Sequence, residues 1–103
     1  MRNLLVAAAL ASILVGCVTA AEQQQQAAAA MDMCNRTTKT GFTHAQCVND
    51  AERRMSGENP FLTMKYAYRL QLGLRIDKGE ITKEEAQAIF AQKVAELQMQ
   101  AAR

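Results

Sequence analysis

The sequence predicts a small all-α domain of three helices, cross-linked by one disulfide and preceded by a signal peptide and an Ala/Gln-rich tether. Three observations lead to this prediction. Residues 83–101 carry apolar side chains at helical spacing, and two segments begin with residues typical of helix N-termini. Only one segment has the alternating pattern of a strand, so no sheet can form.

Length and charge exclude several classes of protein. The chain has 103 residues, with 12 Lys and Arg against 10 Asp and Glu. This length allows one small domain, and the near balance of charge gives no indication of a nucleic-acid partner. Many apolar residues of the first 30 positions are Ala, so the core must come from the later part of the chain.

The N-terminal segment has the length and pattern of a secretory signal peptide. Arg2 precedes an apolar run over residues 4–15 that contains no charge and no Pro. A membrane-spanning helix needs roughly 20 apolar residues, whereas the core of a signal peptide needs only about 7 to 15. The chain turns polar at Glu22 and Gln23, so we predict a signal peptide over residues 1–16.

Leu14-Val15-Gly16-Cys17 ends this run and resembles the lipobox of bacterial lipoproteins, with a branched apolar residue at its head and a small residue before the cysteine. The resemblance implies cleavage before Cys17 and attachment of a diacylglyceryl group to its thiol. Two or more acyl chains anchor a protein stably to a membrane. Val18 occupies the position where lipoproteins of the inner membrane typically carry Asp, so the resemblance implies the outer membrane, with the domain facing the periplasm. The alternative is an unprocessed leader with an incidental cysteine.

Cys34 and Cys47 remain after lipidation of Cys17, and an oxidising compartment favours a disulfide between them. Such a bond would contribute about 3 kcal/mol in the chain-entropy model. The alternative is a metal site formed by both cysteines with His44 and Asp32. That spacing matches no common zinc module, so we predict the disulfide, a solvated His44 and no metal or cofactor.

The segment before the domain, residues 17–30, is predicted to be a low-complexity tether that is disordered or transiently helical. The domain itself spans residues 31–103. Its first helix is predicted to start at a capping box of Thr43 and Gln46 and to end at Gly57. One face of this helix carries apolar residues, namely Cys47, Val48, Ala51 and Met55.

The middle helix is predicted to run from Asn59-Pro60, a good N-cap and first-turn pair, to about Asp77. Every even position between 62 and 76 is apolar, which is the period of a strand, but an isolated strand would leave its backbone unpaired. One helical face is expected to be core and comprises Leu62, Tyr66, Leu70 and Leu74, widened by Leu72 and Ile76.

Another side of this middle helix carries Phe61, Met64 and Tyr68. We predict that it docks onto a second copy of the chain or another envelope protein, because Met and Tyr tolerate an imperfect fit. The alternative is that the tether or the Cys34 segment covers it.

The third helix is predicted over residues 83–101, with Thr82 and Glu85 as a capping box. Its apolar residues lie in one stripe, namely Ala86, Ile89, Phe90, Val94, Leu97 and Ala101. Residues 75–97 also resemble the helical C-termini of small uncharacterised proteobacterial lipoproteins.

No arrangement of residues in the sequence indicates catalysis, because it has one His, no activated serine motif and no phosphate-binding glycine loop. We therefore expect a non-enzymatic envelope lipoprotein that binds a protein partner or maintains the outer membrane. Its expected partners are the membrane, through the lipid anchor, and an envelope protein or a second copy. The alternative is a small periplasmic module that binds a ligand or inhibits an enzyme.

Overall fold

The structure is a computed structural model that describes residues 19–103. This part of the chain forms four α-helices and no strand: α2 (Ala20–Thr37), α3 (Gly41–Ser56), α4 (Pro60–Asp77) and α5 (Lys83–Ala101). The prediction of an all-α fold with one disulfide is confirmed. The middle segment with its strand-like alternation is a helix, as predicted.

Helix α2 is the difference from the predicted three-helix domain. From Ala20 onward, the segment predicted as a tether is part of this helix. Thr19 caps it by accepting a hydrogen bond from the Glu22 N–H (3.1 Å), and Ala and Gln favour helix over coil. Its apolar residues form no broad stripe, and Cys34 is its one buried residue. No apolar pattern in this segment therefore predicts that the helix packs on the rest of the domain.

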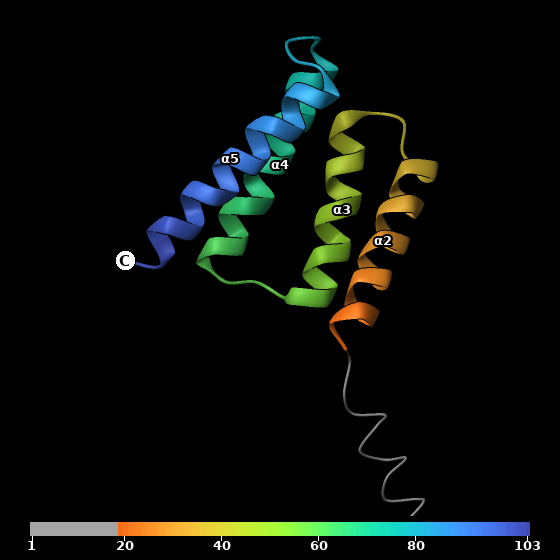
Figure 1. Ribbon diagram of the computed structural model, residues 1–103. Coiled ribbons are helices and arrows are strands. Elements are labelled where there is room, and N and C mark those ends of the chain that lie inside the picture. Colours follow the sequence, from red (N-terminus) through yellow and green to blue (C-terminus); the bar gives the residue numbers. More distant parts are fainter. Residues whose placement is uncertain (1–18) are drawn as a thin grey trace, which may run out of the picture.

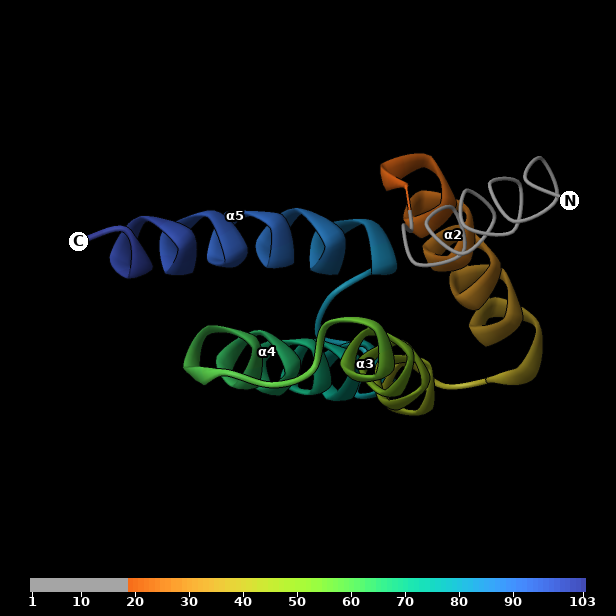
Figure 2. The ribbon, with the colours of Figure 1, turned by 90° about the horizontal axis from the view of Figure 1, so that it is seen from below.

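The helices are arranged as a layer of two with one further helix over each. α3 and α4 pack against each other, α5 packs on α4, and α2 packs on α3 (Figure 1). Seen from below, α2 and α5 lie on the same side of the α3–α4 layer (Figure 2), and in the view of Figure 1 α3 lies between them.

Most helix ends lie where the sequence predicts them. Asn59 accepts a hydrogen bond from the Leu62 N–H (2.8 Å), and Thr82 and Glu85 form their capping box. Gly57 ends α3 with φ of 73°, a conformation that favours glycine. The start of α3 differs, because the capping box is formed by Thr40 and Thr43 rather than by Thr43 and Gln46.

The difference at the start of α3 has a tertiary cause. The Asp77 carboxylate, at the end of α4, accepts hydrogen bonds from the N–H groups of Gly41 (2.6 Å) and Phe42 (3.0 Å). These backbone groups have no partner within their own helix, and a carboxylate there also favours the helix dipole. A residue 36 positions later in the chain therefore helps to fix where α3 begins.

The core lies mainly between α3 and α4. From α3, Ala45, Val48 and Ala51 are buried, while Met55 is 46% exposed. On α4, Leu62, Tyr66 and Leu72 are buried as predicted, but Leu74 is 42% exposed. From α5, Ala86 and Leu97 are buried and Ala101 is exposed.

The buried face of α4 turns away from Leu74 because Gly73 contacts α3 directly. A Cβ built on Gly73 would lie 2.5 Å from the Gly41 carbonyl oxygen, so the two backbones meet where neither residue has a side chain. The apolar stripe proposed through Leu74 is therefore wrong at this end of α4.

Candidate functional site

Cys34 and Cys47 are joined by a disulfide that connects α2 to α3, with their Cα atoms 5.7 Å apart. This is the first of the two interpretations of these cysteines. Their sulfur atoms are bonded to each other, so neither is a thiolate that could bind a metal. Among residues 19–103, no group of three His, Cys, Asp or Glu side chains is placed to hold a metal ion.

The predicted lipidation site, Cys17, and the signal peptide before it lie outside the described residues. Of the helices in the described part of the chain, none combines the length and the apolar character that crossing a bilayer requires. Attachment to a membrane through Cys17 therefore stays a prediction from the sequence.

The predicted interaction face on α4 is only partly open. Met64 is 47% exposed, whereas Phe61 and Tyr68 are half-buried. The Lys93 ammonium of α5 lies 5.5 Å from the centre of the Tyr68 ring, within the range of a cation–π contact. Neither the tether segment nor the Cys34 segment packs here, since α2 lies against α3. Docking at this face stays a prediction, with Met64 as its most exposed member.

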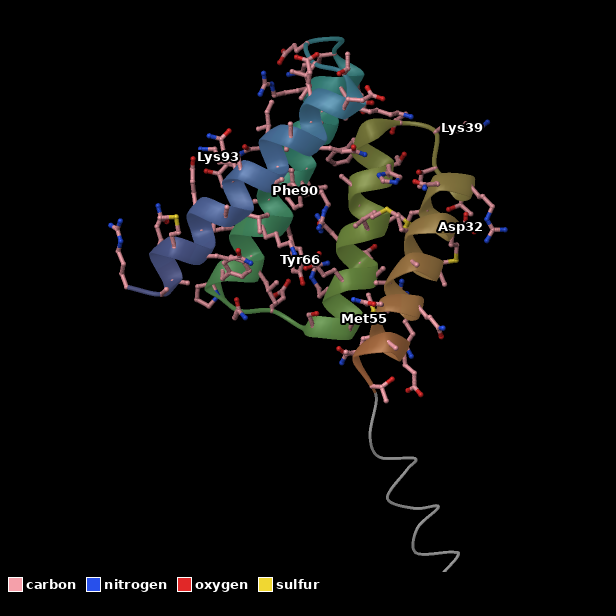
Figure 3. The ribbon with its side chains drawn as sticks, viewed as in Figure 1. Asp32, Lys39, Met55, Tyr66, Phe90 and Lys93 are labelled. Carbon is pink, nitrogen blue, oxygen red and sulfur yellow. A yellow bond between two sulfur atoms is a disulfide. The ribbon has the colours of Figure 1, made fainter. Side chains whose placement is uncertain are left out.

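A groove that the sequence did not predict lies between α2 and the start of α5. It is half-open to solvent, has a volume of about 500 Å³, and is floored by α3 and α4. Its apolar lining includes Val48 from α3, Leu72 from α4, and Ala86 and Phe90 from α5. Figure 3 shows Phe90 directed from α5 toward α3, across the space between the helices. The groove therefore has an apolar floor that is built by three helices.

One residue of the groove lining, Arg69, belongs to an ion cluster between α3 and α4. Arg69 donates hydrogen bonds to Asn49 Oδ1 (2.6 Å) and Glu52 Oε1 (2.7 Å), and its guanidinium lies 4.8 Å from the centre of the Phe90 ring. Lys65 donates to the other Glu52 oxygen (2.6 Å). Two cations thus share one carboxylate, which leaves the cluster with a net positive charge.

The Glu52 carboxylate stays ionised in this cluster. Burial alone would raise the pKa of Glu52, but the hydrogen bonds and charges of Lys65 and Arg69 outweigh that effect and lower the pKa below its ordinary value. All three charged side chains are mostly buried, between 16% and 20% exposed. Removing one member of the cluster by mutation would therefore leave an unpaired charge where water solvates it poorly.

His44 lies on the wall of the groove that α3 contributes, and it is half-buried rather than fully solvated. Its Nε2–H donates a hydrogen bond to Asn35 Oδ1 of α2 (2.7 Å). Desolvation lowers the pKa of His44, and the positive charges of Lys83 and Arg69 lower it further. The imidazole is therefore neutral at pH 7 and lies in a positive electrostatic potential.

The charged residues that line the groove are all basic. They are Lys39 from the α2–α3 connection, Arg69 from α4 and Lys83 from α5, and none of the described lining residues is acidic. Lys39 and Lys83 have no ion-pair partner among the described residues. Figure 3 shows Lys39 extending outward from the α2–α3 connection, whereas Lys83 and Arg69 are the cations that act on His44 of the groove lining.

Sequence reasoning missed the groove because its residues are scattered over four helices and the α2–α3 connection and form no motif. The one signal was Arg69, a charge between Tyr66 and Leu72 on the face of α4 that is otherwise core. A cation at such a position needs buried partners, and two of these partners, Asn49 and Glu52, lie on α3.

Comparison of the chain with protein-family models, with curated proteins and with solved structures finds no match. Two features of the chain itself therefore carry the functional argument: the lipobox-like tetrapeptide before Val18 and the basic, apolar-floored groove.

Proposed function

We propose that this protein is a lipid-anchored lipoprotein of the bacterial cell envelope, and that its helical domain acts by binding rather than by catalysis. The observation that carries the proposal is Leu14-Val15-Gly16-Cys17, placed directly after an apolar run of signal-peptide length. Val18 supports sorting to the outer membrane. The proposed role is to contact another envelope component or to help maintain the outer membrane.

The start of α2 determines how far the domain would lie from the membrane. Ala20 follows Cys17 by three positions, and three extended residues span about 10 Å. A lipid on Cys17 would therefore hold the first turn of α2 close to the bilayer surface. The domain would act at that surface, rather than at the end of the long spacer that a disordered segment to residue 30 would provide.

Lipidation is tested by growing cells with labelled palmitate. The wild-type chain should take up the label, and Cys17→Ser should lose it and accumulate as uncut precursor, because no other thiol follows a lipobox. A double variant, Cys34→Ser with Cys47→Ser, is the matched control and should keep the label. Equal labelling of wild type and Cys17→Ser would show that this proposal is wrong.

The groove supports a second candidate function, that of a small-ligand binding module. Ligand sites are typically concave and mostly apolar, with a few polar groups that orient the ligand. The groove has the apolar floor and, in His44, Arg69 and Lys83, a small set of polar groups. This candidate function and the lipid anchor are compatible, since the anchor would determine where the domain acts and the groove would determine which ligand it binds.

A further inference from the structure

We infer that the groove between α2 and α5 binds a small anionic amphiphile, with its apolar body on the floor of Val48, Leu72 and Phe90 and its acidic head group beside Lys83 and Arg69. The inference rests on the second candidate function and names the class of its ligand. It does not depend on the lipid anchor, so either proposal can fail while the other holds.

The size of the groove favours a small molecule. Sites for small ligands enclose roughly 300 to 1,000 Å³, and this groove of about 500 Å³ lies within that range. It is half-open, so a ligand could enter without separation of the helices. Its lining is mainly apolar, and burial of apolar ligand surface there would supply the main part of the binding free energy.

The charge of the groove favours an anion. Lys83 has no ion-pair partner among the described residues, and Arg69 shares Glu52 with Lys65, so positive charge exceeds negative charge at the wall. Arg69 uses two N–H groups for Asn49 and Glu52, and a guanidinium has five. A carboxylate or phosphate head group would thus meet an uncompensated lysine and further arginine donors.

His44 provides independent support and a means of detection. Besides desolvation, the groups that lower the pKa of His44 are Lys83 and Arg69, so the positive potential extends into the groove. An anion bound between these cations would oppose that potential and raise the pKa of His44. His44 is the one histidine of the chain, so its imidazole gives a single, assignable NMR signal.

The test is an NMR titration of His44 in the full chain, held in nanodiscs of zwitterionic lipid. Three probes separate the two halves of the proposed ligand: octanoate carries both an anion and an apolar chain, acetate only the anion, and octanol only the chain. We expect octanoate to raise the pKa of His44 in a saturable way. The concentrations needed should be at least about tenfold below those at which acetate or octanol changes the His44 signal.

Variants then locate the site. Lys83→Glu reverses a charge at the groove and should weaken octanoate binding about tenfold or more. Gln87→Trp places a large ring in the groove from an exposed position of α5 and should block the site. Lys78→Glu makes the same charge change outside the groove, in the α4–α5 turn, and should bind octanoate as the wild type does.

Two outcomes would overturn the inference. One is that, in the wild type, octanoate changes the His44 signal only at the concentrations at which acetate or octanol also changes it. The other is that octanoate raises the pKa of His44 equally in wild type, Lys83→Glu and Gln87→Trp, which would mean that the anion acts from the nanodisc surface. Circular dichroism of each variant verifies that the helices are retained, and the Gln87→Trp result remains informative if Lys83→Glu unfolds.

Discussion

Gly73 lies near the end of α4, where its Cα faces the backbone of Gly41 at the start of α3. A Cβ at position 73 would lie 2.5 Å from the Gly41 carbonyl oxygen and 2.8 Å from its carbonyl carbon. These atoms belong to the backbone of another helix, so no flexible side chain can move aside. The absence of a side chain at this position is what allows the two helices to approach so closely.

We predict that Gly73→Ala lowers the free energy of unfolding by about 1 to 2 kcal/mol. Alanine has a better helix propensity than glycine by about 1 kcal/mol, but forced separation of packed elements costs about 1 to 3 kcal/mol or more. The steric cost should be larger because the clash is with backbone. Thermal melting by circular dichroism measures the result, and the expected drop is roughly 5 to 10 °C.

Ala67→Gly, at an exposed position of the same helix, is the matched control for the propensity effect. It should lower stability by about 1 kcal/mol. If Gly73→Ala instead raised the melting temperature, helix propensity would dominate, and the close contact with Gly41 would be shown to be loose.

At the scale of the element, α2 depends on one covalent bond. Cys34 is its one buried residue and is fully buried, and the disulfide to Cys47 ties the helix to α3. Most of the stability of a helix in a protein comes from packing of an apolar face rather than from helix propensity, and α2 has no other buried side chain to supply it. The other helices are held by burial of larger side chains, such as Leu62, Tyr66 and Leu97.

We predict that replacing both cysteines, Cys34→Ala with Cys47→Ala, releases α2 while α4 and α5 remain folded. Loss of the bond should cost about 3 kcal/mol in the chain-entropy model, and α2 has little buried surface to offset that cost. Hydrogen exchange read by mass spectrometry should show faster exchange in residues 20–37 and nearly unchanged exchange in α4. Cys17→Ser is the control that removes a thiol and keeps the disulfide. Uniform loss of protection, or none in α2, would contradict this account.

At the scale of the whole molecule, the domain is an open arrangement rather than a closed bundle. α2 and α5 lie over different helices of the α3–α4 layer, and the groove lies between them (Figure 2). The side of α4 that carries Met64 and Tyr68 is covered only in part by α5, through the Lys93–Tyr68 contact. Met64 is left 47% exposed beside it. The molecule thus presents a basic groove and a separate, small apolar surface.

We predict that Met64→Glu weakens self-association or capture of an envelope partner without unfolding the domain. The exposed thioether makes a favourable contact only when it is covered, so a charge there should affect docking more than stability. Sedimentation velocity and crosslinking in intact cells measure association, and circular dichroism measures folding. Met99→Glu is the matched control, since Met99 is 63% exposed at the end of α5. Equal association of both variants and wild type would exclude docking at Met64.

The sequence by itself determined most of the local structure. Asn59-Pro60, Gly57 and the Thr82–Glu85 capping box place helix ends correctly, because caps act between residues a few positions apart. The pairing of Cys34 with Cys47 also followed from the sequence, since two cysteines remain once Cys17 is assigned to a lipid. Residues 60–77 were predicted to be helical despite their strand-like alternation, because the sequence has no second strand candidate to pair with them.

Only the tertiary structure decided three other features. α2 is ordered because a disulfide and α3 hold it, and a segment of Ala and Gln carries no pattern that reveals such a partner. α3 begins at Gly41 because Asp77 supplies a cap from 36 positions away. The groove exists because α2 and α5 sit on the same side of one layer at a distance, which brings Val48, Phe90 and Lys83 to one place. Contacts between distant positions depend on how helices cross, and the spacing of residues along one helix does not determine that geometry.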